Sequence, residues 1–364
     1  MFQEKLDSSV KKCKSCGGNM IFSPQFQSLY CEKCGGQEKF DFIQDYSKHA
    51  YLPNKNQKDK NNLSKDKIFK CSSCGANVVL STGDMANVCP YCNSSFVVEN
   101  SEIKGLKPDF VIPFAFDRSR ASDMFKAGIK RKWFLPNKFK KAPPIDQIYG
   151  IYFPVFSFDE HTESSYNGVL EKDETVRNGE NTTTIVKSFR ISGHKSLNHT
   201  NILTETSNHL NQSVFNQILP YNIGGAYKYN ENFIRGYAVE YYTDPLDLCK
   251  KQADLIIDDI VRSHILSGYR YDRVRYLNVS TVRSDEKFAY GIMPAYRFNY
   301  NYNGKDYETL INGQTGKVGG GLPKSKVKIT FFVLAILLIL IGIGVLITFK
   351  WNRSIRQLKQ IIWE

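Results

Sequence analysis

Residues 292–304 read Ile-Met-Pro-Ala-Tyr-Arg-Phe-Asn-Tyr-Asn-Tyr-Asn-Gly, and this stretch predicts the fold of the central part of the chain. Aromatic side chains alternate with other residues from Tyr296 to Tyr302, which is the period-two pattern of a strand with one buried face. Asn303-Gly304 is a preferred two-residue hairpin turn, because both residues tolerate a positive φ. The stretch therefore predicts an antiparallel hairpin with an aromatic face that Tyr307 extends.

Related phrases occur twice earlier in the chain, at residues 111–116 and 152–158. Each begins apolar–apolar–proline and continues with aromatic residues, as expected for strands. The second phrase leads to Asn167-Gly168, which predicts another hairpin turn at that point. A ladder that stacks nucleic-acid bases is the alternative role for these aromatic residues. The nucleic-acid role is disfavoured because residues 146–310 carry 17 basic and 21 acidic residues, so that this region has a net negative charge.

Two helices are predicted in the same region. One is short and basic, from Ser119 to Phe134. The other runs from Pro245 to Leu266 with Asp244 as its N-cap. Its expected buried stripe consists of Leu248, Ala253, Ile256, Ile257, Ile260, Val261 and Ile265. We interpret Cys249 and His264 on this helix as packing residues, and the polar stretch 171–213 as a long surface excursion.

Eight of the nine cysteines occur in four CxxC pairs, and these pairs form two sets with equal inner gaps of 14 residues. The second set follows the first at an offset of 58 positions, which indicates an internal duplication. Two CxxC knuckles at the ends of neighbouring hairpins can deliver four thiolates at tetrahedral angles. Gly17, Gly35 and Gly75 allow the positive φ that such turns need. The predicted metal ligands are Cys13, Cys16, Cys31 and Cys34 in one set and Cys71, Cys74, Cys89 and Cys92 in the other.

The cysteine pattern predicts two closed, structural Zn²⁺ sites in tandem zinc ribbons. The runs Met20-Ile21-Phe22 and Val78-Val79-Leu80 are the expected ribbon strands. Disulfides, a redox CxxC motif and an iron–sulfur cluster are the alternatives. The polar segment between the ribbons predicts a flexible linker that lets the two units move independently.

Residues 329–349 read ITFFVLAILLILIGIGVLITF and contain no charged residue. About 20 such residues cross the hydrocarbon core of a bilayer, so we expect a single transmembrane helix here. Four basic residues flank the predicted helix on each side, so the positive-inside rule does not indicate its orientation in the membrane. Metal-binding thiolates need a reducing compartment. We therefore expect the N-terminal domains to lie in the cytoplasm and the helix to cross the cell membrane once. The tail has apolar residues at helical spacing among basic ones, so it is either an interfacial helix or a frayed end.

The formal charge of +13 is unevenly distributed. Residues 101–145 and 311–364 each carry a net +7, whereas residues 1–100 carry +3 and residues 146–310 carry −4. The excess therefore lies beside the predicted span and in one internal segment. We expect it to engage anionic lipid headgroups. Nucleic acid is the less favoured partner.

The sequence contains no HExxH, GxSxG or P-loop motif, and no catalytic or cofactor-binding residues are predicted, so we expect a protein that is not an enzyme. Residues 313–317 resemble a P-loop only superficially and predict a turn. The expected fold is α+β, with a mixed α/β body of antiparallel hairpins. In chain order we expect zinc ribbon 1 in 1–50, a flexible linker in 51–67, zinc ribbon 2 in 68–100, a cytosolic body in 101–328, a transmembrane helix in 329–349 and a basic amphipathic tail in 350–364.

These features resemble a family of bacterial membrane-anchored proteins with tandem zinc ribbons of the transcription-factor-IIB type. The shared elements are the two ribbons and the phrases Leu106–Phe114, Ile148–Pro154 and Ile311–Lys317. Members are often mislabelled as primosomal-helicase-like, although no motor motif is present here. The long polar linker and the basic tail are less typical.

The resemblance implies an accessory role in bacterial envelope stress, with SPFH-type or phage-shock-like membrane coat proteins as partners. We therefore expect a tail-anchored adaptor that docks a partner protein at the membrane. The alternative is a membrane-tethered nucleic-acid-binding protein that uses the ribbons and the basic segment 118–141.

Overall fold

The computed structural model describes most of the chain outside the N-terminus and the second cysteine set. The described residues are 11–18, 20–53, 67–70, 75–80, 107–141, 143, 148–178, 181–206, 212–240, 242 and 244–362. Four predicted ligands, Cys71, Cys74, Cys89 and Cys92, lie outside these ranges. The described part contains helices and largely antiparallel sheets, so the coarse α+β prediction is confirmed.

A small N-terminal sheet contains three strands in the order β1-β2-β3. Their bounds are Met20–Ser23, Ser28–Cys31 and Gln37–Glu38. β1 and β2 pair in an antiparallel hairpin from Met20↔Cys31 to Ser23↔Ser28. The predicted strand at Met20-Ile21-Phe22 is therefore confirmed, and the hairpin ends beside the first cysteine set.

A large sheet of eleven strands forms the rest of the described β structure. Its long path runs β10-β7-β12-β8-β11-β6-β5, with β4, β9, β13 and β14 attached beside it. Most neighbours are antiparallel, but β11 and β8, and β12 and β7, are parallel. The bounds are β4 His49–Ala50, β5 Lys67–Lys70, β6 Asn77–Leu80, β7 Phe110–Val111, β8 Tyr149–Asn178, β9 Asn181–Glu205, β10 Tyr227–Lys228, β11 Ala238–Glu240, β12 Arg273–Tyr302, β13 Lys305–Asn312 and β14 Val318–Gly320.

The hairpin predicted at residues 292–304 is confirmed. β12 pairs with β13 up to Tyr302↔Lys305, and Asn303 and Gly304 have φ values of 52° and 72°. The aromatic face packs against α1 (Arg118–Arg131) and α2 (Asn137–Lys141), with Phe298 and Phe125 ring centroids 4.6 Å apart. Phe298 is 1% exposed. This face is therefore part of the core and does not present a ladder for bases.

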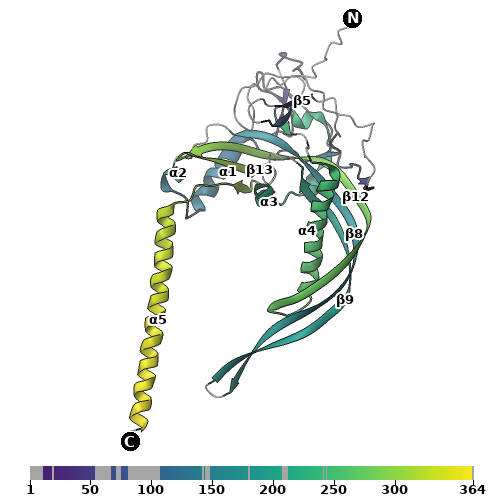
Figure 1. The fold of residues 1–364 in the computed structure, drawn as a ribbon. Coiled ribbons are helices and arrows are strands. Elements are labelled where there is room, and N and C mark those ends of the chain that lie inside the picture. Colours follow the sequence, from purple (N-terminus) through teal and green to yellow (C-terminus); the bar gives the residue numbers. More distant parts are fainter. Residues whose placement is uncertain are drawn as a thin grey trace.

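Three strands extend beyond the body as a curved arm, which we define as residues 161–178 of β8, 181–198 of β9 and 273–284 of β12 (Figure 1). Asn167-Gly168 lies in the middle of this arm, so the turn predicted there is wrong. Gly168 instead permits close strand approach, because a Cβ at this position would lie 2.6 Å from the Tyr276 carbonyl oxygen. Most of the polar stretch 171–213, predicted as a long surface excursion, is regular strand in this arm.

The long helix α4, Leu246–Ser267, covers one face of the arm. It begins after Pro245 without a side-chain cap, so the predicted Asp244 cap is wrong. Its apolar buried stripe is Cys249, Ala253, Ile257, Val261 and Ile265. Leu248, Ile256 and Ile260 are exposed, and so is His264, because the narrow arm covers only one row of the helix. Shorter helices, α3 (Gln212–Ile218), η1 (Ile223–Gly225) and η2 (Glu231–Ile234), lie between β9 and β11.

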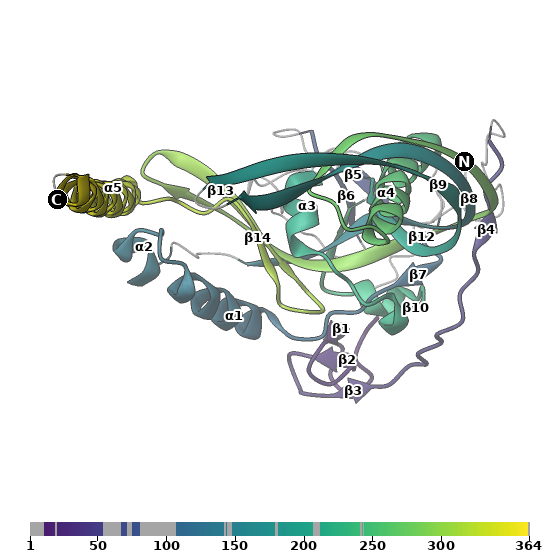
Figure 2. The same cartoon turned by 90° about the horizontal axis from the view of Figure 1, so that it is seen from below.

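The C-terminal helix α5, Lys326–Ile362, leaves the body as a single rod. Its segment Lys326–Val345 is 20 residues long, has a mean hydropathy of 2.7 and is not buried by the rest of the chain. A helix that is long and apolar enough to span a membrane is therefore present where one is predicted. α5 continues as helix through the predicted tail, and it projects on the same side of the body as the arm (Figures 1 and 2).

Gly291 in β12 lies against Phe110 of β7, and a Cβ there would be 2.1 Å from the ring. Because Phe110 is fully buried, the ring has no free space to move into. We expect Gly291→Ala to lower the free energy of unfolding by about 1–3 kcal/mol, the usual cost of overpacking a core. Thermal and denaturant unfolding of the full chain in detergent measure the change.

The matched control for this substitution is Gly128→Ala in α1, where a Cβ would lie 3.8 Å from Val318. This change should be neutral or stabilising by up to about 1 kcal/mol, because alanine favours a helix. Equal effects of the two substitutions would contradict the packing described for Gly291.

Candidate metal centre

Two knuckles of the same backbone geometry carry the first cysteine set. In the first knuckle, the Gly17 N–H donates to the Cys13 carbonyl at 2.9 Å, and the Cys13 N–H donates to the Gly18 carbonyl at 2.7 Å. In the second knuckle, Gly35, Cys31 and Gly36 repeat both bonds at 2.8 Å. Gly17 and Gly35 have φ values of 69° and 75°, so the prediction of positive φ at these glycines is confirmed.

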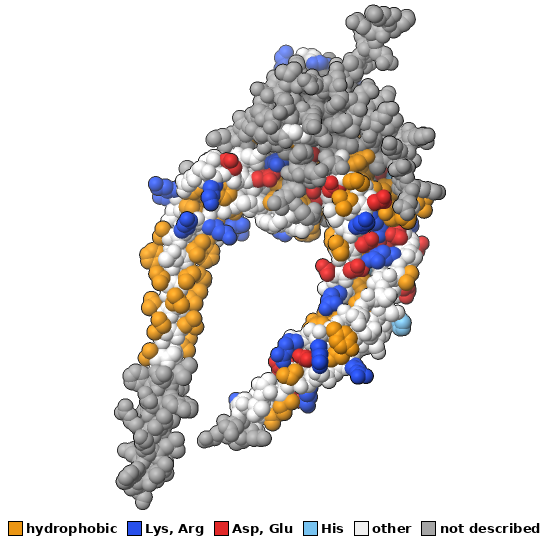
Figure 3. All heavy atoms as spheres, in the orientation of Figure 1, with side chains coloured by type: hydrophobic (Ala, Val, Ile, Leu, Met, Phe, Trp, Pro, Cys, Tyr) orange, Lys and Arg blue, Asp and Glu red, His pale blue; other side chains and the backbone are white. Residues whose placement is uncertain are grey.

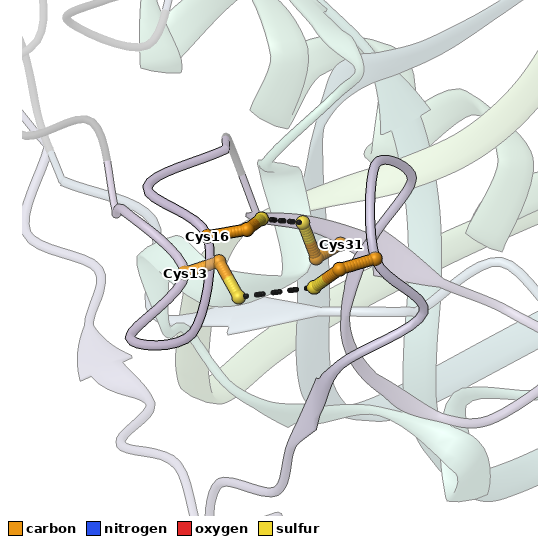
Figure 4. Close-up of side chains that lie close together, drawn as sticks. Cys13, Cys16 and Cys31 are labelled. Atoms are coloured by element: carbon orange, nitrogen blue, oxygen red, sulfur yellow. Dashed lines mark hydrogen bonds between the residues drawn. The ribbon is translucent and has the colours of Figure 1, made fainter.

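The four sulfurs of Cys13, Cys16, Cys31 and Cys34 converge, all within 4.8 Å of one another (Figure 4). The Sγ atoms of Cys13 and Cys34 are 3.5 Å apart, as are those of Cys16 and Cys31. A disulfide would require about 2.05 Å. A tetrahedral metal with bonds of about 2.3 Å to sulfur holds its ligands about 3.8 Å apart. The four cysteines could therefore hold a metal ion.

The second glycine of each knuckle makes room for the sulfurs, a role that the sequence pattern alone did not predict. A Cβ on Gly18 would lie 3.0 Å from the Cys31 sulfur, and a Cβ on Gly36 would lie 3.4 Å from those of Cys13 and Cys34. The Gly18 N–H also points to the Cys16 sulfur at 3.4 Å. The sequence signal was the Gly-Gly pair that follows both CxxC motifs, at 17–18 and 35–36.

The electrostatics of the cluster favour bound cations. Backbone N–H groups of Ser15 and Cys16 lower the pKa of the Cys13 thiol to about 6, and the Cys34 N–H lowers the pKa of Cys31. The Gly36 N–H also lowers the pKa of Cys34, but the three neighbouring cysteines outweigh it and raise that pKa to about 12. Four adjacent thiols cannot all lose their protons without a compensating positive charge. A divalent metal supplies that charge.

The first cysteine unit is packed onto the body. Phe22 of β1 is 1% exposed, and its ring centroid lies 5.4 Å from that of Phe233 in η2. The Phe22 N–H donates to the Arg235 carbonyl at 2.9 Å, and Gln27 Nε2 donates to the Phe114 carbonyl at 3.0 Å. This unit is therefore fixed to the body, because its hydrophobic face is shared with it, and the predicted independence of the two ribbons from each other stays a prediction.

The hairpin that flanks the second cysteine set is also joined to the body. β6 contains the predicted strand Val78-Val79-Leu80 and pairs with both β5 and β11. Gly75 has the expected positive φ, at 73°. The second set of ligands lies outside the described residues, so the second metal site stays a prediction.

An acidic cluster at the base of the arm also brings ligand-type oxygens together, in Glu160 of β8, Asp254 of α4 and Glu286 of β12. Its centre is filled by the Lys250 ammonium, which is 2.7 Å from Glu160 and 2.6 Å from Glu286 and also pairs with Asp254. Burial raises the pKa of Glu160 above its ordinary value. Burial opposes the charge of Lys250 as well, but its carboxylate partners outweigh this and raise its pKa. We interpret the cluster as a structural ion-pair network.

The lone Cys249 lies apart from the metal cluster. It is fully buried in α4, and burial raises its pKa to about 12. Its interpretation as a packing residue is confirmed.

Comparisons with known proteins give one full-length relative. The uncharacterized protein YdjG of Bacillus subtilis (strain 168) is 25% identical over 347 residues, which cover 92% of this chain and 98% of the relative. No family model and no solved structure matches the chain. The similarity therefore extends over the whole architecture but names no activity.

Cys31→Ser should remove one metal ion per chain, because a hydroxyl is a poor replacement for a thiolate ligand. Elemental analysis of the purified full chain measures the metal content, and thermal unfolding should begin at a lower temperature. Cys249→Ala is the matched control, since it removes a buried cysteine outside the cluster and should leave the metal content unchanged. A full metal complement in the Cys31→Ser protein would contradict the predicted role of Cys31 as a required ligand.

Proposed function

We propose that this protein is a non-enzymatic, membrane-anchored zinc-ribbon adaptor that docks or retains a partner protein at the cytoplasmic membrane. The observation that carries the proposal is the 20-residue apolar segment of α5, of which no part is buried. Such a surface is unfavourable in water and favourable in hydrocarbon. The helix therefore supplies an anchor, and the remainder of the chain is available for binding.

Zinc is the metal that suits four converging thiolates. A closed set of four cysteine ligands is typical of structural Zn²⁺ sites, which have no open position for water or substrate. We expect one ion at the first set and a second at Cys71, Cys74, Cys89 and Cys92. The metal holds the knuckles that present the surface of each unit, which fits a docking role better than a chemical one.

The arm offers a second docking surface. In the described part of the chain, β9 pairs with β8 along one edge, and no strand pairs with its other edge. A free edge of 25 residues can accept a strand from a partner through main-chain hydrogen bonds. The edge strand β9 carries the basic residues Lys187, Arg190 and Lys195. Repulsion between like charges therefore disfavours its pairing with β9 of a second copy of this chain. The edge therefore suits a partner with an acidic or neutral strand.

Orientation follows from thiol chemistry. Metal-bound thiolates persist in a reducing compartment, so we place the ribbons and the body in the cytoplasm. The family that the sequence resembles suggests SPFH-type or phage-shock-like membrane coat proteins as partners.

The arm limits how α5 can enter a bilayer. Its strands carry many polar side chains and exposed main-chain edges, which cannot lie in hydrocarbon. Since the arm and α5 project on the same side of the body (Figure 1), α5 must tilt away from the arm when it spans a membrane. Leu322 packs on the body core and Pro323 is buried. The Ser325 N–H, Lys328 and Phe332 also hold the start of α5 on residues 133–137, so the tilt begins beyond Phe332.

Fluorophores on non-natural amino acids at Thr183 in the arm and Asn352 in α5 test this tilt in the full chain. Their separation in lipid nanodiscs should exceed the separation in the present structure. A pair at Thr183 and Lys251, on the arm and α4, is the control and should keep its separation. An unchanged distance between Thr183 and Asn352 would contradict the tilt.

The adaptor role is tested by crosslinking in intact cells. Wild type should recover a reproducible partner in the membrane fraction, and Cys31→Ser should lose that partner while it stays in the membrane through α5. Cys249→Ala should keep the partner. An identical partner set for the wild type and Cys31→Ser would count against docking through the first ribbon.

The same cells report orientation. Protease added outside spheroplasts should leave residues 1–328 intact, and the protein should resist carbonate extraction. Digestion of the ribbons from outside would overturn the cytoplasmic placement, and release by carbonate would overturn the anchor.

A further inference from the structure

The turn between α1 and α2, residues 132–136, places large aromatic side chains at the surface. Trp133 is 69% exposed and Phe134 is 37% exposed. Leu135 and Phe139 beside them are buried and hold the turn on the body. Because Phe134 contacts Phe332 of α5, these side chains continue the exposed apolar surface of that helix, and a contiguous apolar surface of this kind marks a contact with a membrane or a protein.

This turn contacts the start of α5. Lys328 donates to the carbonyls of Trp133 at 3.1 Å and Leu135 at 2.9 Å, and to Asn137 Oδ1 at 2.7 Å. The Ser325 N–H donates to the Phe134 carbonyl at 2.7 Å. The Phe134 and Phe332 rings meet edge to face at 5.3 Å. Trp133 therefore lies at the level where α5 changes from basic to apolar.

Basic side chains gather around the same point (Figure 3). Residues 124–141 and 322–328 together contain ten basic residues and no acidic one. None of these basic residues pairs with a carboxylate in the part of the chain that the structure describes. We define the basic corner by its exposed members, which are Lys126, Lys130, Arg131, Lys132, Lys138, Lys141, Lys324 and Lys326.

We propose that the basic corner binds the phosphate groups of anionic phospholipids, with Trp133 inserted at the bilayer interface. The proposal rests on the membrane crossing of α5 described above. Tryptophan prefers the headgroup level, and each basic residue near an anionic surface favours binding about fivefold. The basic corner combines residues that are almost 200 positions apart in the sequence, because α1, α2 and the start of α5 meet at this point.

The corner keeps its place when α5 tilts. Phe125 and Phe139 pack against Phe298 and Tyr300 of β12, and Leu322 and Pro323 hold the chain on the body just before α5. The distance from the corner to the first turn of α5 therefore stays short. Binding through the basic corner also fixes which side of the body faces the membrane.

The test uses the full chain with Trp351→Phe and Trp363→Phe, so that Trp133 is the only tryptophan. Nanodiscs contain equal amounts of phosphatidylcholine and phosphatidylglycerol, with bromine on one lipid or the other. Quenching of Trp133 should be at least about twofold stronger when the anionic lipid is brominated, and high salt should reduce this preference.

Lys130→Gln/Arg131→Gln/Lys132→Gln should abolish the lipid preference. Lys172→Gln/Arg177→Gln/Arg190→Gln removes three exposed basic residues from the arm and should preserve it. Equal quenching by both lipids in the parent chain would overturn the proposal. The proposal would also be overturned if the parent chain showed no lipid preference but bound an oligonucleotide, and if the triple substitution at Lys130, Arg131 and Lys132 abolished that binding. A chain that fails to enter nanodiscs would overturn the anchor itself, which separates the two failures.

Discussion

The antiparallel pairing of β8 with β12 is the interaction on which the rest of the structure depends. It extends from Arg297↔Tyr149 in the body to Arg273↔Glu171 in the arm. In the body, both faces of these strands are covered by aromatic and aliphatic side chains. In the arm, one face packs on α4 and the other meets solvent. One ladder thus builds a buried core at one end and a long sheet with one exposed face at the other.

The metal unit depends on this core as well as on its cysteines. A three-stranded sheet of this size buries little by itself, so its stability must come from its neighbours and from any metal ion that the four cysteines hold. Phe22 supplies the second contribution by packing into the aromatic cluster around Phe233. The first cysteine unit is consequently a fixed feature of the body surface.

The ion-pair network around Lys250 shows how the arm keeps its register. Lys250 on α4 contacts Glu160 of β8 and Glu286 of β12, and Arg283 reaches Glu160 at 3.1 Å. A buried network that loses one partner leaves an uncompensated charge, which is strongly unfavourable. The network therefore ties α4 to both strands where the arm leaves the body, and it requires no bound metal.

Features set by local chemistry could be predicted from the sequence alone. The knuckles of the first cysteine set, the Asn303-Gly304 turn and the apolar run of α5 each depend on a few neighbouring residues, and each is present as predicted. Asn167-Gly168 has the same turn chemistry as Asn303-Gly304 but lies within a strand, because pairing with β12 and β9 on both sides outweighs the local preference. The buried row of α4, the contact of the first ribbon with Phe233 and the meeting of Trp133 with the start of α5 were decided only by the tertiary structure. Each of them joins segments far apart in the chain, and the free energy of burial that selects such partners has no counterpart in local sequence spacing.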